Sequence, residues 1–344
     1  MKICEQIFDN IEIRENGEAF FCCEHGIHEI YLGNVHDESF DKIWNSEIAV
    51  DIRKNALEGK YPYCTHNICP KITNPEEYFP PKKDDYKSIM QRGPIFVAFY
   101  LGEACNAKCI FCRDNIKIET KEKTEEYKKI FYSAYYPILK DVKTIQISNT
   151  CEIFYSDFFK EIIKKITEEF PQIKFRIITN GTLLTEENIK QLNLENKISE
   201  LYVSINAATA KTHQKISRIN AWKNLTKNLD YIKNIPSIQN NLHFTFVVCK
   251  HNYKEMKNFV KFAEKYNAKI SFWEIRNHQN NSLENDYYEL AVHLKEHKEN
   301  NKLKKHLASK IFNQENVLLS PALKQLRDDE LNKKTNSFFY KLFK

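Results

Sequence analysis

The chain has 344 residues, of which 42% are apolar and 13% aromatic, and its formal charge is +6. This composition excludes a disordered chain, because the apolar surface is large enough to offset the entropy cost of ordering. The charge excess is small and spread over many Lys-rich stretches, so no nucleic-acid partner is expected. The longest apolar run, Ile95 to Leu101, is too short to span a membrane.

Ten cysteines are the most informative part of the composition. The first residues, MKICEQIFDN, carry acidic side chains where a signal peptide needs an apolar segment, so we expect a cytoplasmic protein. In that reducing compartment, cysteines serve as metal ligands or redox groups more often than as disulfides.

The chain is expected to contain four segments. Residues 1–75 form a Cys-rich module, and residues 76–92, which are rich in proline and charge, form a linker. Residues 93–276 form the core, and residues 277–344 are a Lys-, Asn- and Leu-rich helical extension.

Within residues 93–276, short apolar runs alternate with longer amphipathic stretches. Strands joined by helix-length crossovers pair in parallel with right-handed connections, which predicts an α/β fold as an open or partial barrel. We expect the functional site at the carboxyl ends of the strands. The predicted strands are 95–101, 144–148, 175–179, 201–206, 243–249 and 269–275, and the predicted helices include 158–170, 186–193 and 254–267.

A C-x3-C-x2-C loop, formed by Cys105, Cys109 and Cys112, follows the first of these strands. Three thiolates at this spacing can hold three irons of a [4Fe–4S] cluster and leave the fourth iron open to a small molecule. A structural zinc site is the alternative, and it would need a fourth protein ligand from elsewhere in the chain.

This loop, together with TNG at 179–181, VSINAAT at 203–209 and FVVCKHN at 246–252, resembles the radical SAM superfamily over residues 95–276. The resemblance implies a partial (β/α)6 TIM-like barrel. It also implies that the cluster binds S-adenosylmethionine (SAM), which one electron cleaves to a 5′-deoxyadenosyl radical. A flavodoxin or ferredoxin is the implied electron donor.

The same resemblance implies roles for individual residues. Cys105, Cys109 and Cys112 correspond to the cluster ligands. The segment 149–152 stands where the family commonly has Gly-Gly-Glu facing the methionyl amine, with Cys151 in place of the second glycine. The ordinary alternatives are a turn residue for Asn180, a barrel serine for Ser204 and a solvated arginine for Arg218. The implied contacts to SAM are Phe111, Glu152, Asn180, Ser204 and Arg218.

The N-terminal segment resembles the SPASM or twitch-type auxiliary cluster module of the same superfamily, here placed before the barrel, whereas most members have it after. The resemblance rests on the cysteine spacing and on LGNVHDESFDKIWNS at 32–46. It implies a second [4Fe–4S] cluster, and a four-cysteine zinc site is the alternative. The implied ligands are Cys4, Cys22, Cys64 and Cys69. Cys23 could replace Cys22 as a ligand.

Two further cysteines, Cys151 and Cys249, fall at the expected carboxyl ends of strands. A thiol is a good hydrogen-atom donor, so either could quench a substrate radical in the way that epimerising members of the family do. A small buried apolar cysteine is the alternative at each position.

Three functions follow from these patterns. The first is a radical SAM oxidoreductase or epimerase that acts on a carbohydrate-like or other small polar molecule. The second is a maturase of a ribosomally made peptide, which is disfavoured because no winged-helix-like segment for a leader peptide is present in the sequence. The third is a non-catalytic iron–sulfur electron carrier, to which an open iron would give no advantage.

Overall fold

The computed structural model describes residues 1–22, 30–65, 69–147, 150–277 and 287–342, and the side chains of all these except residues 70 and 334–342. Cys23 and Asn149 lie outside the described residues. The chain divides into two compact units, each of which is described by itself. Unit 1 comprises Met1–Ala104 and Ile118–Ile177, and unit 2 comprises Cys105–Lys117 and Ile178–Lys344.

The sheet of unit 1 has the strand order β6-β5-β4-β1-β2-β3. β4 pairs in parallel with β5 on one side and with β1 on the other, while β2 and β3 continue from β1 as antiparallel strands. The N-terminal segment thus adds a strand to the parallel sheet, which the sequence analysis did not predict. The strands are β1 (Asn10–Arg14), β2 (Glu18–Phe20), β3 (Gly33–Asn34), β4 (Phe96–Tyr100), β5 (Thr144–Ile147) and β6 (Lys174–Thr179).

The longest helix of unit 1, α7 (Asp157–Glu169), confirms the helix predicted over 158–170. The hydroxyl of Ser156 caps it by accepting from the Phe159 amide at 3.2 Å, and a stripe including Ile162 and Ile166 is buried. The other helices are α1 (Gln6–Asp9), α2 (Phe40–Trp44), α3 (Glu47–Leu57), α4 (Pro70–Thr73), α5 (Pro75–Tyr78), α6 (Lys121–Ile130), η1 (Phe131–Tyr135) and η2 (Tyr136–Lys140).

Unit 2 contains four parallel strands in the order β10-β9-β8-β7. Phe244 lies opposite Val203 on one neighbouring strand and opposite Ile270 on the other, and all three side chains are buried. The strands are β7 (Ile198–Ser204), β8 (Leu242–Val248), β9 (Lys269–Glu274) and β10 (Val317–Leu319). The six strands predicted between residues 93 and 276 are therefore all present, with ends displaced by a few residues at most.

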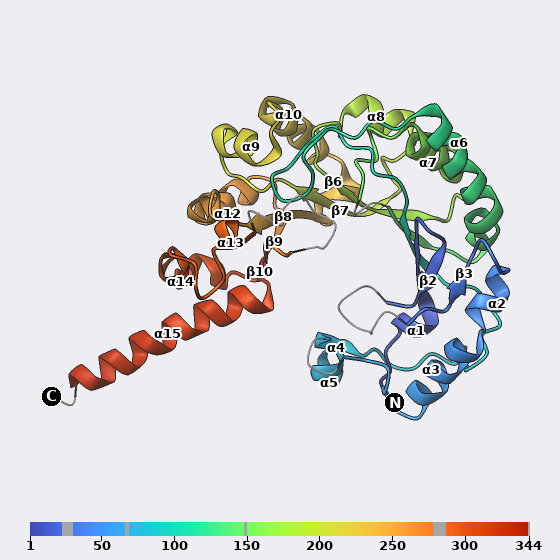
Figure 1. Ribbon diagram of the computed structural model, residues 1–344, viewed down its shortest axis with the longest axis horizontal. Helices are drawn as coiled ribbons and strands as arrows, with labels where there is room; N and C mark the ends of the chain where they lie inside the picture. The colour runs from blue at the N-terminus through green and yellow to red at the C-terminus, as the bar shows by residue number, and fades with distance from the viewer. Residues whose placement is uncertain (23–29, 66–68, 148–149, 278–286, 343–344) are drawn as a thin grey trace. The chain divides into compact units, whose positions relative to one another are not determined.

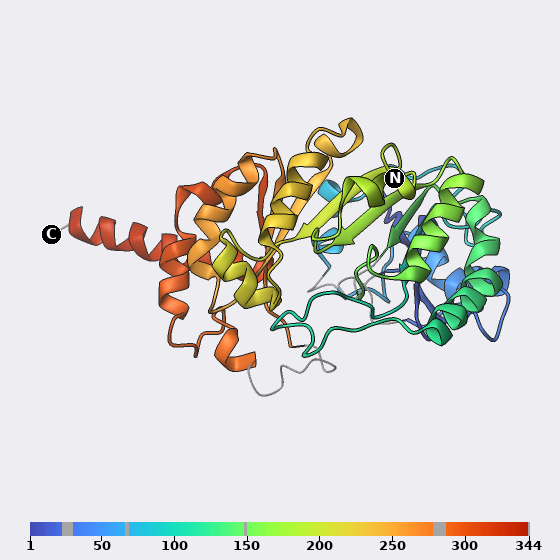
Figure 2. The same ribbon diagram turned by 90° about the horizontal axis from the view of Figure 1, so that it is seen from above.

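Helices follow most strands of unit 2, and α12 (Met256–Glu264) confirms the central part of the helix predicted over 254–267. β10 interrupts the extension that was predicted to be helical, and α15 (Pro321–Leu342) follows it and projects away from the rest of its unit (Figures 1 and 2). The other helices are α8 (Glu186–Gln191), α9 (Ala210–Ser217), α10 (Trp222–Ile232), α11 (Pro236–Gln239), η3 (Tyr253–Glu255), α13 (Tyr287–Leu290), α14 (Asn300–Leu307) and η4 (Lys310–Asn313).

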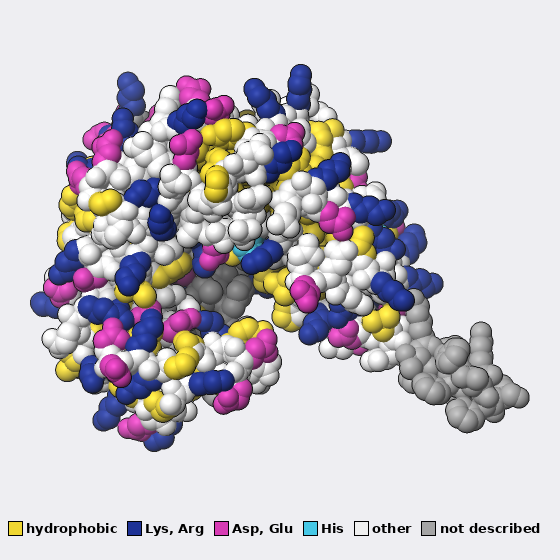
Figure 3. All heavy atoms as spheres, turned by 180° about the vertical axis from the view of Figure 1, so that it is seen from behind, with side chains coloured by type: hydrophobic (Ala, Val, Ile, Leu, Met, Phe, Trp, Pro, Cys, Tyr) yellow, Lys and Arg dark blue, Asp and Glu magenta, His cyan; other side chains and the backbone are white. Residues whose placement is uncertain are grey.

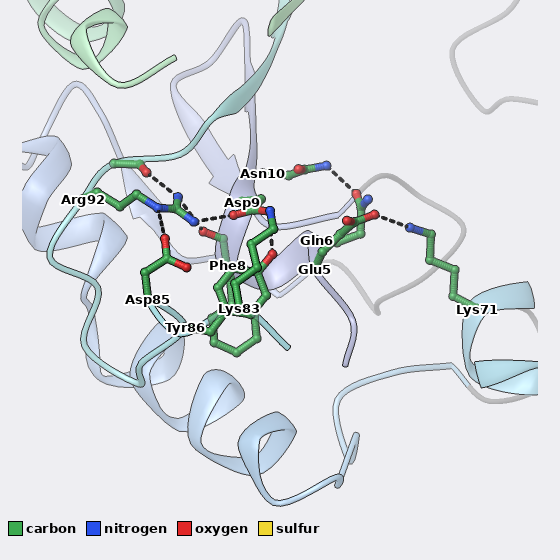
Figure 4. Close-up of polar contacts among 11 residues, drawn as sticks. Glu5, Gln6, Phe8, Asp9, Asn10, Lys71, Lys83, Asp85, Tyr86 and Arg92 are labelled. Atoms are coloured by element: carbon green, nitrogen blue, oxygen red, sulfur yellow. Dashed lines mark hydrogen bonds and ion pairs between the residues drawn. The ribbon is translucent and has the colours of Figure 1, made fainter. Parts of the chain in front are cut away.

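A buried carboxylate, Asp9, joins the N-terminal segment to residues 83–92 of unit 1 (Figure 4). It accepts hydrogen bonds from Arg92 at 2.5 Å, from Lys83 at 2.7 Å and from the Tyr86 hydroxyl at 2.6 Å. Burial, and then the hydrogen bond to Asp9, raise the pKa of Tyr86. Residues 83–92 are therefore held against the segment that carries Cys4.

The charged side chains are mixed on the surface. On the face seen in Figure 3, Lys and Arg side chains are interspersed with Asp and Glu. In the described part of the chain, no helix combines the length and the apolar composition that crossing a bilayer requires.

Candidate functional site

The three-cysteine loop after β4 belongs to unit 2, where backbone hydrogen bonds fix it at its base and in its middle. The Cys105 amide donates to the Lys117 carbonyl at 2.9 Å, which closes the base of the loop. In its middle, the Ile110 amide donates to the Ile216 carbonyl at 2.9 Å, beside the end of α9. The loop thus has a defined backbone conformation, although it has few residues in regular structure.

The three thiols of this loop interact electrostatically with one another. Burial, and then the negative charges of Cys112 and Cys105, raise the pKa of Cys109 to about 12. Arg113 lies beside them and donates from its Nε to the Sγ of Cys112 at 3.4 Å. A positive charge in this place favours the thiolate form that iron binds.

Asn180, at the end of β6, is fixed by a closed ring of hydrogen bonds. Its Nδ2 donates to Asn106 Oδ1 at 2.9 Å, Asn106 Nδ2 donates to the Thr182 hydroxyl at 2.9 Å, and that hydroxyl donates to Asn180 Oδ1 at 2.6 Å. The ring directs the Asn180 amide nitrogen toward the Cys105 sulfur, 4.0 Å away. Asn106 and Thr182 were not predicted, and their only sequence signal was their position next to two motif residues.

Phe111 and Cys249 pack in one hydrophobic cluster of unit 2. Cys249 is fully buried with Ile216 and Ile275, and the half-buried ring of Phe111 lies against this cluster. Burial raises the pKa of Cys249 to about 11, and its amide donates to Asn252 Oδ1 at 2.8 Å. Phe111 therefore anchors the cysteine loop to the interior of the unit.

Ser204 and Arg218 have different environments. The Ser204 hydroxyl, at the end of β7, accepts from the hydroxyl of Thr245 on β8 at 3.0 Å. Arg218 is exposed, has a left-handed backbone with φ of 55°, and lies 3.7 Å from Asp114. That contact joins the cysteine loop to the end of α9.

The segment after β5 belongs to unit 1. Its Thr150 hydroxyl donates to the Gly102 carbonyl at 2.9 Å, and the Glu152 amide donates to the Ala104 carbonyl at 2.7 Å. Glu152 is only 1% exposed, and Cys151 is half-buried. These bonds hold the segment against the residues that directly precede Cys105.

The four cysteines predicted as auxiliary ligands line one cavity in unit 1. Burial, and then the charges of Cys4 and Cys69, raise the pKa of Cys64 to about 12. Burial also raises the pKa of Cys4, whose amide donates to the Tyr61 hydroxyl at 3.2 Å. Cys4 and Cys64, which are 60 positions apart in the sequence, are thereby brought to one site.

Beside this cavity, Arg53 is a fully buried cation that the sequence analysis did not assign to the site. It donates to the carbonyls of Ile7 at 2.8 Å and Trp44 at 2.7 Å, and its guanidinium stacks on the rings of Phe21 and Trp44. Burial, and then the charge of Arg92, lower its pKa to about 9. Arg53 thus holds α1, α2 and α3 together around the cysteines.

Two family models match the chain. Residues 99–263 match the radical SAM superfamily, and residues 4–70 match an iron–sulfur cluster-binding domain, SPASM. The core of the chain, residues 99–263, belongs to the radical SAM superfamily. The N-terminal module that the sequence predicted is therefore confirmed, as is the partial-barrel class of its α/β core.

Several solved structures are similar to the chain at low sequence identity. TYW1 with a lysine–pyruvate adduct is 17% identical, over 65% of this chain and 72% of that chain, with a TM-score of 0.37. The structure of anSMEcpe with bound AdoMet is 17% identical, over 65% and 60%, with a TM-score of 0.41. Coproporphyrinogen III oxidase (HemN) from Escherichia coli is 12% identical, over 54% and 45%, with a TM-score of 0.40. No curated protein sequence matches the chain.

The cofactors of this radical SAM protein are a [4Fe–4S] cluster that binds SAM, SAM itself, and an auxiliary cluster. The donor sets fit them, since three interacting thiols in unit 2 leave an iron open and four thiols line the cavity of unit 1. None of the nine described cysteines forms a disulfide. Among the described residues, no three His, Cys, Asp or Glu side chains are grouped as ligands of a single metal ion.

Proposed function

We propose that the chain is an enzyme that cleaves SAM reductively to a 5′-deoxyadenosyl radical and abstracts a hydrogen atom from a substrate C–H bond. The substrate is a carbohydrate or another small polar molecule, and the outcome is oxidation or epimerisation. The observation that carries the proposal is the loop of Cys105, Cys109 and Cys112, whose thiols interact with one another and with Arg113.

In this proposal the cluster, when bound, supplies the electron that cleaves SAM, and the protein positions the reactants. Asn180, held by its hydrogen-bond ring, donates toward Cys105, and Phe111 anchors the loop. Glu152 would receive the methionyl amine of SAM, and Ser204 and Arg218 would contact other parts of it. The enzyme acts in the cytoplasm and takes its electrons from a flavodoxin or ferredoxin.

For epimerisation, the proposal needs a hydrogen-atom donor. After loss of a hydrogen atom to the bound cofactor, the substrate radical would receive a hydrogen atom on the opposite face from a cysteine S–H, and the cysteine would be restored by one electron and one proton. The electron comes from the flavodoxin or ferredoxin through the auxiliary cluster. Cys151 is half-buried and Cys249 is fully buried. The greater accessibility of Cys151 supports it for this role.

Iron content and SAM cleavage test the proposal. The protein, reconstituted anaerobically, is expected to bind about eight irons per chain and to release 5′-deoxyadenosine from SAM on reduction. Replacing the three loop cysteines by alanine should remove half of the iron and all SAM cleavage. Replacing Cys4 and Cys64 by alanine should remove the other half and leave SAM cleavage in place.

Isotope transfer tests the substrate class and the hydrogen donor. Deuterium from a labelled sugar should appear in 5′-deoxyadenosine, whereas deuterium from a labelled peptide would support the maturase alternative. In D2O, Cys151→Ala should lose solvent deuterium from the product, and Cys249→Ala should retain it. A reconstituted protein without SAM cleavage would overturn the enzyme and favour an electron carrier.

A further inference from the structure

Lys71 stands out among the charged groups of the auxiliary site. Lys71 lies on α4, two positions after Cys69. Its side chain lines the cavity together with the four cysteines. The side chain is 29% exposed, so the surrounding protein shields it from most of the solvent.

Lys71 is paired with Glu5, the residue that follows Cys4 (Figure 4). Lys71 Nζ lies 3.5 Å from Glu5 Oε1, and the Glu5 side chain is 35% exposed. The two side chains carry opposite charges, and Glu5 directly follows Cys4 in the sequence. The pair therefore bridges the two chain segments that carry Cys4 and Cys69.

We propose that Lys71 raises the reduction potential of the auxiliary [4Fe–4S] cluster and that Glu5 partly offsets this effect. The inference rests on the proposed function, because it requires that the four cysteines hold that cluster. One electron from the reductant adds one negative charge to the cluster, with no bond made or broken. A shielded cation beside the cluster stabilises this reduced form, because net charge and solvent exposure set the potential.

Lys60 provides a matched control, because it is the other lysine that lines the cavity. Its side chain is 67% exposed and pairs with Glu58 at 2.8 Å. Solvent therefore screens its charge far more effectively than that of Lys71.

The test is a redox titration of the full-length, reconstituted protein, followed by electron paramagnetic resonance with SAM present. The signal that SAM leaves unchanged reports the auxiliary cluster. At the wild-type midpoint, Lys71→Met should lower the ratio of reduced to oxidised auxiliary cluster roughly tenfold, or about 59 mV for one electron. Glu5→Gln should raise the ratio, and the double variant should return it toward one. Lys60→Met should change the ratio less than about twofold.

Iron content separates the possible failures. If the wild type holds only about four irons, the auxiliary cluster of the proposed function is wrong. If the wild type holds both clusters and Lys71→Met leaves the auxiliary midpoint unchanged, the role of Lys71 is overturned. If Lys71→Met fails to take up iron, two other variants test the role of Lys71. The inference requires that Lys71→Arg keep the wild-type midpoint of the auxiliary cluster and that Glu5→Gln raise it.

Discussion

Replacing Asp9 by alanine should destabilise unit 1 and release the segment that carries Cys4. Asp9 is 3% exposed and accepts from three donors, of which the Tyr86 hydroxyl belongs to a fully buried residue. Removing the carboxylate leaves that hydroxyl without its acceptor and leaves Arg92 with one acidic partner, Asp85.

The loss can be estimated donor by donor. The half-buried Arg92 side chain loses a charge-assisted hydrogen bond that contributes about 1.5–3 kcal/mol. The buried Tyr86 hydroxyl loses its partner at a cost of about 1–3 kcal/mol. Lys83, whose side chain is 46% exposed, turns to water and adds less than about 0.5 kcal/mol. The free energy of unfolding of unit 1 should therefore fall by about 2.5–6.5 kcal/mol.

Urea unfolding, followed by circular dichroism, measures this loss as a lower midpoint at an unchanged slope. Asp85→Asn is the matched control, because Asp85 is the other acidic partner of Arg92. The Asp85 side chain is 49% exposed. The substitution should cost less than about 1 kcal/mol. Equal losses in the two variants, or a loss under about 1 kcal/mol in Asp9→Ala, would refute the reasoning that burial makes Asp9 decisive.

Two further predictions concern unit 2. Gly181→Ala should lower the free energy of unfolding of unit 2 by about 2–4 kcal/mol, as measured in urea. The reason is that φ at Gly181 is +75° and a Cβ there would lie 2.7 Å from both Leu225 and Val203. A loss under about 1 kcal/mol would contradict this prediction. Burial lowers the pKa of His213 to about 4 from 6.5, so the native state binds fewer protons than the unfolded chain between these values, and stability falls as pH falls. Between pH 7 and pH 5.5 this residue should cost about 1.2 kcal/mol, and His213→Gln should show a correspondingly smaller loss in urea unfolding at the two pH values.

The sequence by itself predicted those parts of the fold that local patterns encode. Strand β8 and helix α7 were predicted because apolar residues recur with the period of each element. The pairing of β4 with β1 was not predicted, since no periodicity shows which distant segments will pair. β10 was missed for a related reason, because its three residues are too few to show an alternation.

For the candidate site, the sequence supplied the chemistry and the tertiary structure supplied the neighbours. The spacing of Cys105, Cys109 and Cys112 indicated a cluster with an open iron, because three nearby thiolates are a property of the loop itself. The sequence showed neither that Asn180 is aligned toward Cys105 nor that Lys71 forms an ion pair with Glu5 beside Cys4. Hydrogen-bond direction and burial arise only when separate segments pack together, and the tertiary structure alone decides them.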